Sequence, residues 1–184
     1  DWYMGVKSYL TTVKTRFEKP ALVVDEAGLL DSQEETALLT KLNEISQRQK
    51  MDVVVLTVSS IYGSTPQEYA DNYFDYNGYG QGSDHDGVLL LINMGERDWY
   101  VSTTGYGIYA ITDAGLDYIS DKCLNHLSSG DYALAFNTYA DLVDQFVTQA
   151  KTDTPYDSDS LPKDPLSLMW LPVSGLLALV VAWL

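Results

Sequence analysis

Helical periodicity covers much of the chain. Apolar residues recur at spacings of three and four in residues 2–18, which predicts an amphipathic helix that ends at Pro20. Its apolar face could dock on the neighbouring domain or lie on a membrane surface. The same spacing predicts four further helices, over residues 32–50, 65–76, 112–127 and 131–151.

Polar residues mark where three of these helices begin. Ser32 with Glu35, and Thr65 with Glu68, have the spacing of a capping box, in which each side chain accepts the backbone N–H of the other residue. Asp131 is predicted to be the N-cap of the last helix. The strands are expected between these helices.

Apolar runs predict the strands. Residues 52–59 and 88–94 are apolar on both faces, as in a strand buried inside a sheet, and residues 98–103 alternate apolar with polar side chains. A shorter strand is predicted at 21–25. The glycine-rich residues 77–87 and the residues 104–108 are predicted to be loops.

The order of these elements predicts an α/β fold. The strand at 52–59, the helix at 65–76 and the strand at 88–94 form a βαβ unit, so its strands should be parallel and its crossover right-handed. A short turn joins 88–94 to 98–103, so these two strands should be antiparallel. The predicted fold class is a three-layer α/β/α sandwich with a central mixed β-sheet and helices on both faces.

Changes in composition divide the chain into four segments. These are an amphipathic helical segment at 1–19, the α/β domain at 20–151, a polar linker at 152–164 and a transmembrane helix at 165–184. The last segment carries no charge from Pro165 onward and, at about 1.5 Å per residue, spans about 30 Å, the thickness of a hydrocarbon core. A buried soluble helix is the alternative.

The ends of the chain suggest a fragment of a longer protein. Trp170 and Trp183 lie where the aromatic belts of a membrane helix would be, but no lysine or arginine follows Leu184 as a stop-transfer signal. No signal peptide begins at Asp1, which fits a start after a cleaved or deleted segment.

Charge restricts the choice of partners. The chain has 11 lysine and arginine residues against 26 aspartate and glutamate residues, a formal net charge of −15. Nucleic acid is not expected as a partner, because phosphate binding needs a basic face. The acidic balance fits bound cations, or serves solubility alone.

The single cysteine is predicted to be structural. One thiol excludes an internal disulfide. Cys123 shares helical spacing with Leu116, Ile119 and Leu127 on an apolar face, so it is interpreted as a small core residue rather than a nucleophile.

Two loops are predicted to meet at one edge of the sheet. Asp84 and Asp86 directly precede the strand at 88–94, and the antiparallel strand returns the loop Gly105-Tyr106-Gly107 to the same edge. Asp113 follows shortly after. Carboxylates and backbone carbonyls are hard oxygen ligands, which predicts a Ca²⁺ or Mg²⁺ site. The alternative is ordinary turn chemistry, which also places aspartates near glycines.

Sharper catalytic motifs do not fit. The segment Asp84-His85-Asp86-Gly87-Val88 matches the Asp-x-Asp-x-Val motif of haloacid-dehalogenase phosphatases. In those enzymes the motif follows an apolar strand, but here it follows a glycine-rich loop. An EF-hand-like spacing from Asp75 lacks the final glutamate and precedes a strand. No P-loop or Gly-x-Ser-x-Gly occurs. His85 and His126 are the only histidines, too few for a zinc site rich in His and Cys, and no serine triad is supported.

Several short segments together resemble the TPM domain family. The segments are Val24–Leu30 followed by Ser32–Glu35, Glu68–Ala70, Gly78–Gly80, Asp86–Ile92, Arg97, Gly105–Gly107, Thr112–Asp113 and Gly130–Tyr132. No single segment is specific, but their order and spacing over about residues 20–150 are. The family includes thylakoid-lumen, photosystem-repair and nematode acetylcholine-receptor-modulator proteins, with many bacterial membrane-anchored members.

The resemblance implies properties beyond the fold. It implies divalent-cation binding by loop aspartates in some members, here Asp25, Asp84, Asp86 and Asp113 by position, and weak acid phosphatase activity in some. It also implies an exported domain followed by a membrane helix. His85, where another polar residue is usual, and Tyr76-Asn77, where many members have tryptophan, depart from the family pattern.

Two functions are therefore expected. The first is a membrane-anchored, extracytoplasmic module that binds a divalent cation and membrane-protein partners, with an assembly, repair or modulatory role. The second is a metal-dependent phosphatase, in which a bound ion would polarise a phosphoryl oxygen and a loop aspartate would act as base. Against it, no nucleophile–base pair is evident, and Arg97 is the one candidate for a phosphate clamp. The catalytic residues, the substrate and the oligomeric state are not predicted.

Overall fold

The structure, a computed structural model, describes residues 20–163 as an α/β domain. Its strands are β1 (Val23–Asp25), β2 (Asp52–Val58), β3 (Gly87–Asn93) and β4 (Asp98–Thr104), in the order β1-β2-β3-β4. β1, β2 and β3 are parallel, and β4 is antiparallel to β3. The predicted βαβ unit and the hairpin that follows it are confirmed.

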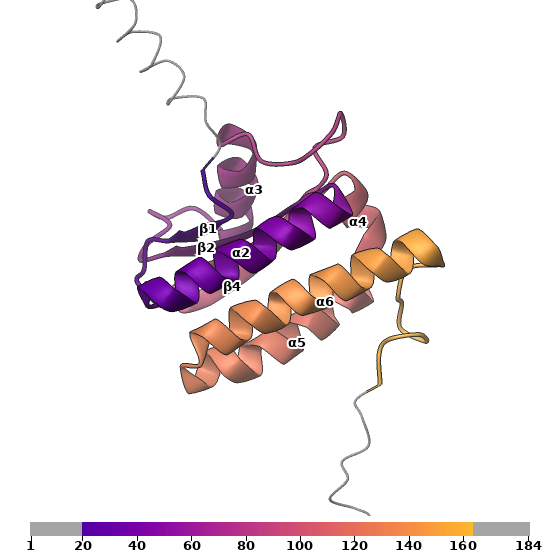
Figure 1. The fold of residues 1–184 in the computed structure, drawn as a ribbon. Helices are drawn as coiled ribbons and strands as arrows, with labels where there is room; N and C mark the ends of the chain where they lie inside the picture. Colours follow the sequence, from indigo (N-terminus) through magenta and orange to yellow (C-terminus); the bar gives the residue numbers. More distant parts are fainter. Residues whose placement is uncertain (1–19, 164–184) are drawn as a thin grey trace, which may run out of the picture.

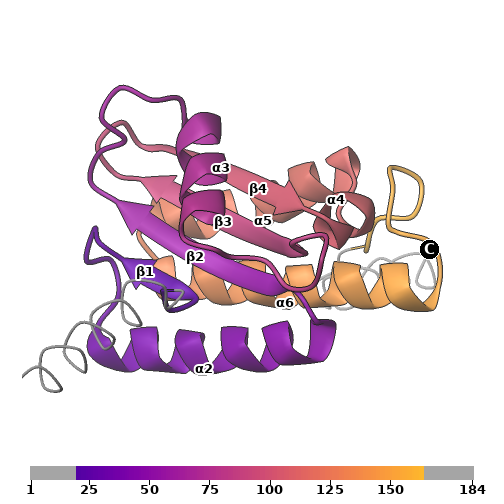
Figure 2. The ribbon, with the colours of Figure 1, turned by 90° about the horizontal axis from the view of Figure 1, so that it is seen from above.

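Helices cover both faces of this sheet. They are α2 (Ser32–Gln49), α3 (Pro66–Tyr76), α4 (Tyr106–Ala110), α5 (Asp113–Ser129) and α6 (Tyr132–Thr152). Helix α3 packs on one face against β3 and β4, whereas α2 and α6 cover the other face and α5 packs against α6 (Figures 1 and 2). This arrangement confirms the predicted three-layer sandwich.

The continuous apolar runs form the middle of the sheet. Every residue of β2 and β3 is buried, because helices lie on both faces and strands on both edges. Asp52 pairs with Gly87 at one end of these strands, and Val58 pairs with Asn93 at the other. This register defines an amino edge and a carboxyl edge of the sheet, which the site below depends on.

The N-cap residue of one helix lies one position earlier than predicted. Asp31 rather than Ser32 caps α2: its Oδ1 accepts the N–H of Gln33 and of Glu34, each at 2.8 Å, and Glu34 returns the bond to the Asp31 N–H at 2.9 Å. Both pairs have capping-box spacing, and aspartate is as good an N-cap as serine.

The second capping box is confirmed. The Thr65 hydroxyl accepts the Glu68 N–H at 3.2 Å, and the Glu68 carboxylate accepts the Thr65 N–H at 3.3 Å. Pro66 occupies the first turn of α3, where its missing N–H costs no helical hydrogen bond. Asp131 is the N-cap residue of α6, as predicted, although its side chain makes no capping hydrogen bond.

Cys123 lies in the core, as predicted. It is 3% exposed on α5, and burial raises the pKa of its thiol from 9.0 to about 12. Because the pKa is higher in the folded state, the contribution of the protonated thiol to folding stability is complete below about pH 9. This contribution is lost as the pH rises from about 9 to about 12.

We therefore expect native Cys123 to resist alkylation at pH 8. Iodoacetamide labelling followed by mass spectrometry should show modification only after urea has unfolded the chain. Rapid labelling of the folded protein would mean that α5 opens readily.

The predicted membrane attachment is corrected. None of the helices within residues 20–163 has the length and apolar character needed to cross a bilayer. The helices predicted at 2–18 and 165–184 lie outside the described residues. The expected partners, a membrane reached through the C-terminal helix and further membrane proteins, therefore have no support from the structure.

Candidate functional site at the amino edge of the sheet

A tight loop leads into the amino end of β3. The backbone N–H groups of Gln81 and Asp86 each donate to the carbonyl of the other residue, at 3.0 and 2.8 Å. Gly80 allows this closure, because a Cβ at its position would lie 2.6 Å from the His85 carbonyl oxygen. His85 itself adopts a left-handed φ of 53°. The predicted loop is therefore a closed structure held by backbone hydrogen bonds.

Asp86 joins this loop to its neighbours. Its backbone carbonyl accepts the Asp52 N–H at 3.0 Å, and its half-buried carboxylate accepts the Tyr106 N–H through Oδ1 at 2.6 Å. The other carboxylate oxygen, Oδ2, lies on the side of Gly82. Within residues 20–163, it accepts no hydrogen bond. Asp86 therefore has one engaged oxygen and one available oxygen.

The loop after β4 meets the Asp84–Asp86 segment, as predicted. A Cβ on Gly105 would lie 2.3 Å from the Asp86 Oδ1 and 2.5 Å from the Asp84 carbonyl oxygen, so only glycine fits. The Thr104 hydroxyl donates to the His85 carbonyl at 2.6 Å. The antiparallel hairpin causes this meeting, because Thr104 pairs with Gly87 in the register.

Asp113 does not join this cluster. Residues 104–108 were predicted to be a loop, but the helix α4 begins at Tyr106 and carries the chain away before Asp113, which is exposed in the first turn of α5. No side-chain cap marks the start of α4, so its sequence gives no start signal. Asp84 is exposed and approaches Gly105 through its backbone carbonyl.

Asp25 lies at the opposite edge of the sheet. It pairs with Thr57 near the carboxyl end of β2, whereas Asp86 adjoins the amino end. Its carboxylate accepts the N–H of Leu29 at 3.1 Å and of Leu30 at 2.8 Å, and it also accepts the Thr57 hydroxyl. Asp25 therefore holds the turn after β1 and cannot share an ion with Asp86.

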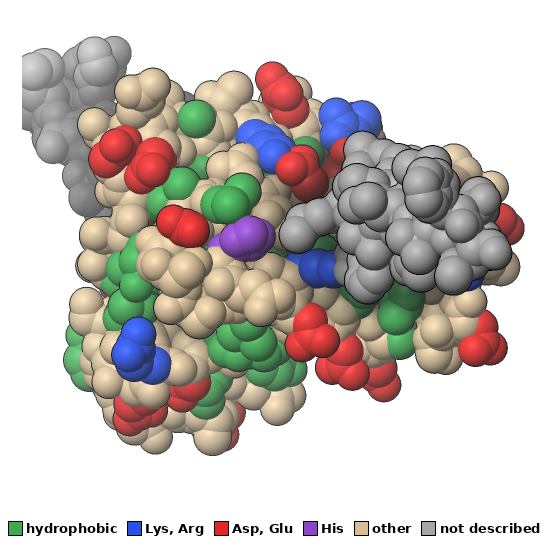
Figure 3. Space-filling view, turned by 90° about the horizontal axis from the view of Figure 1, so that it is seen from below, with side chains coloured by type: hydrophobic (Ala, Val, Ile, Leu, Met, Phe, Trp, Pro, Cys, Tyr) green, Lys and Arg blue, Asp and Glu red, His purple; other side chains and the backbone are tan. Residues whose placement is uncertain are grey.

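The four predicted aspartates thus do not form one cluster. Within residues 20–163, no three His, Cys, Asp or Glu side chains lie close enough together to hold a metal ion. Acidic side chains are spread over the face in Figure 3 rather than gathered at one point. Any ion at this edge would need backbone carbonyls and water beside the Asp86 carboxylate.

Two neighbours of Asp86 escaped the sequence interpretation. The Asp52 carboxylate, 1% exposed as a residue, accepts the Gly80 N–H at 2.6 Å and the Gln81 side-chain amide at 3.2 Å. The sequence signal that could have identified Asp52 is an acidic residue at the start of an apolar strand. Through these hydrogen bonds, the Asp52 carboxylate stabilises the loop that leads into β3.

Lys151, in the last turn of α6, is the second neighbour. Its ammonium donates to the Gln49 carbonyl and lies 5.6 Å from the centre of the Tyr106 ring. Burial lowers the pKa of Lys151, the Asp86 carboxylate raises it, and Lys50 lowers it again. No sequence pattern connects it with Asp86, because 65 positions separate the two residues and the four elements β3, β4, α4 and α5 lie between Asp86 and helix α6.

Comparison with known proteins shows which family and which solved structures the chain is similar to. A TPM domain family model matches residues 23–146. The N-terminal domain of a protein from P. gingivalis is 25% identical with a TM-score of 0.62, over 76% of this chain and 89% of that chain. No curated protein matches the chain.

Two further solved structures share the fold. The N-terminal domain of cg2496 from Corynebacterium glutamicum is 21% identical with a TM-score of 0.54, over 78% of this chain and 87% of that chain. The protein BA42 from Bizionia argentinensis is 13% identical with a TM-score of 0.57, over 74% of this chain and 91% of that chain.

Proposed function

Since the chain belongs to the TPM domain family, we propose that it is a non-catalytic binding module whose amino-edge loops hold a divalent cation, Ca²⁺ or Mg²⁺, against Asp86. One observation carries the proposal: the half-buried Asp86 carboxylate joins two loops through Oδ1 and keeps Oδ2 available. A hard cation on Oδ2, completed by carbonyl oxygens and water, would order both loops.

Electrostatics at this edge favour a cation but also limit its affinity. Asp52, Asp84 and Asp86 make this edge acidic, although their three carboxylates do not gather at one point, so the Asp86 carboxylate would supply most of the attraction for a cation. The Lys151 ammonium already offsets part of the Asp86 charge. Removing the Asp86 charge should therefore weaken cation binding, whereas removing the Lys151 charge should strengthen it.

Thermal unfolding with chelator and with Ca²⁺ or Mg²⁺ tests the proposal. An ion that binds only the folded state should add about 2.7 kcal/mol at a hundredfold excess over its dissociation constant. Asp86→Asn should abolish the shift, and Lys151→Gln should tighten binding roughly threefold by removing a competing charge. Asp117→Asn, an exposed aspartate on α5, is the matched control and should behave as the wild type. An unchanged wild-type midpoint would remove the site.

Phosphatase chemistry has less support at this edge. The Thr104 hydroxyl donates to a backbone carbonyl rather than to a side-chain base, and the Asp86 Oδ1 is held by a backbone N–H. A phosphatase would need a nucleophile or a water oriented by a base. Hydrolysis of p-nitrophenyl phosphate by wild type, lost in Asp86→Asn, would overturn the non-catalytic part of the proposal.

A further inference from the structure

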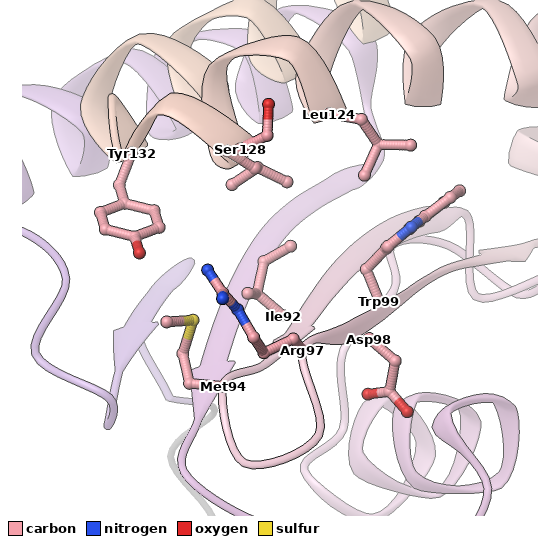
Figure 4. A pocket seen from close by; sticks show the side chains of 9 residues that line it. Ile92, Met94, Arg97, Asp98, Trp99, Leu124, Ser128 and Tyr132 are labelled. Atoms are coloured by element: carbon pink, nitrogen blue, oxygen red, sulfur yellow. The ribbon is translucent and has the colours of Figure 1, made fainter.

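A pocket of about 420 Å³ opens at the opposite, carboxyl edge of the sheet. It lies between the β3–β4 turn, the second half of α5 and the first residue of α6 (Figure 4). Its volume falls within the range of small-molecule sites, which is about 300–1,000 Å³. It is separate from the Asp86 loops, because it adjoins the other end of β3.

The walls of this pocket are apolar. Ile92 and Trp99 come from paired positions of β3 and β4, and Leu124 and Leu127 face them from α5. Met94, after β3, adds a flexible thioether that adapts to irregular shapes. Such walls suit a compact hydrocarbon or aromatic body.

One end of the pocket is cationic. Arg97 is exposed in the β3–β4 turn and makes no ion pair or hydrogen bond within residues 20–163. Figure 4 shows its guanidinium between Met94 and Ile92, with the Tyr132 hydroxyl turned toward the same space. The backbone of Arg97 has a φ of 57°, which residues other than glycine rarely adopt. The turn therefore holds this guanidinium at the pocket at a conformational cost.

Asp98 does not neutralise this end of the pocket. It follows Arg97 and also borders the pocket, but its carboxylate points away from the cavity in Figure 4. Alternation along β4 explains this direction, because Trp99 faces the pocket and its neighbour must face the other side of the sheet. The guanidinium is therefore available to an anion.

We propose that this pocket binds a small amphipathic carboxylate, with the carboxylate on Arg97 and Tyr132 and an acyl or aryl body against Trp99, Leu124 and Leu127. The planar guanidinium fork matches a carboxylate with two parallel hydrogen bonds. The apolar walls discriminate against small hydrophilic anions, and the volume excludes a two-chain lipid. The proposal is independent of the cation site.

Titration of the isotope-labelled full chain with decanoate, below its micelle concentration, tests this site by NMR. Decanoate should shift the Trp99 indole resonance and the amides of residues 94–99 and 124–132. Decanol and decyltrimethylammonium carry the same chain with no charge or the opposite charge, and each should bind at least tenfold more weakly. A shift of the Trp99 indole reports binding at this pocket, because Trp99 lines it.

Variants separate the contribution of the Arg97 charge from that of the apolar pocket walls. Arg97→Gln should weaken decanoate binding about tenfold, whereas Arg48→Gln, which removes a distant arginine paired with Asp144, should leave it unchanged. Leu127→Trp should fill the pocket and abolish decanoate binding. Equal affinity for decanol and decanoate, an unaffected Arg97→Gln, or no shift of Trp99 at millimolar decanoate would each overturn the proposal.

Discussion

Replacing Gly105 with alanine should lower the free energy of unfolding by about 3 kcal/mol. The new Cβ would lie 2.3 Å from the Asp86 Oδ1 and 2.5 Å from the Asp84 carbonyl oxygen. The backbone there has φ 55° and ψ −125°, a region costly for alanine. Overpacking and backbone strain each contribute about 1–3 kcal/mol. Urea unfolding followed by circular dichroism measures the loss.

Gly63→Ala is the matched control for the close contact. Gly63 also has a positive φ, 84°, but a Cβ there would meet no atom within 4 Å. Its substitution should cost only about 1 kcal/mol, through backbone strain alone. If both variants lost the same stability, the contact between the Gly105 and Asp86 loops would contribute nothing and the site geometry would be wrong.

Asp25→Ala should also be strongly destabilising, by about 3 kcal/mol. The substitution removes the acceptor for the Leu29 and Leu30 N–H groups and for the Thr57 hydroxyl. Hydrogen bonds to a charged group contribute about 1.5–3 kcal/mol, and donors left unpaired in a half-buried turn add to the loss. Glu26→Ala, at the exposed next position, should change stability by less than about 0.5 kcal/mol.

The same variant distinguishes a structural from a metal-binding role for Asp25. Because Asp25 and Asp86 lie at opposite edges, the stabilisation by Ca²⁺ or Mg²⁺ should have the same size in Asp25→Ala as in the wild type. A fully stable Asp25→Ala that no longer responds to cation would place Asp25 in the site after all.

Local sequence patterns predicted most of the fold. The apolar runs of β2 and β3 are long enough to require burial on both faces, and the short β3–β4 turn leaves only an antiparallel arrangement. The meeting of Asp86 with Gly105 follows from that hairpin. This half of the site was therefore predictable from element order.

The missing half depends on contacts between distant parts of the chain. The sequence could not assign the edge of Asp25, because β1 has three residues and its pairing with β2 is set by packing. Helix α4 has five residues and no cap, so nothing local separated Asp113 from the glycine loop. The neighbour Lys151 and the Arg97 pocket likewise arise only when helices α5 and α6 pack on the sheet.

An NMR titration of the isotope-labelled chain with Ca²⁺ and Mg²⁺ tests the central proposal most directly. The Tyr106 amide donates to the Asp86 carboxylate, so its resonance reports any ion bound there. We expect the largest shifts at residues 81–87 and 104–107, and we expect these shifts to disappear in Asp86→Asn. Resonances of these residues that stay fixed at millimolar cation, or that shift equally in Asp86→Asn, would contradict it.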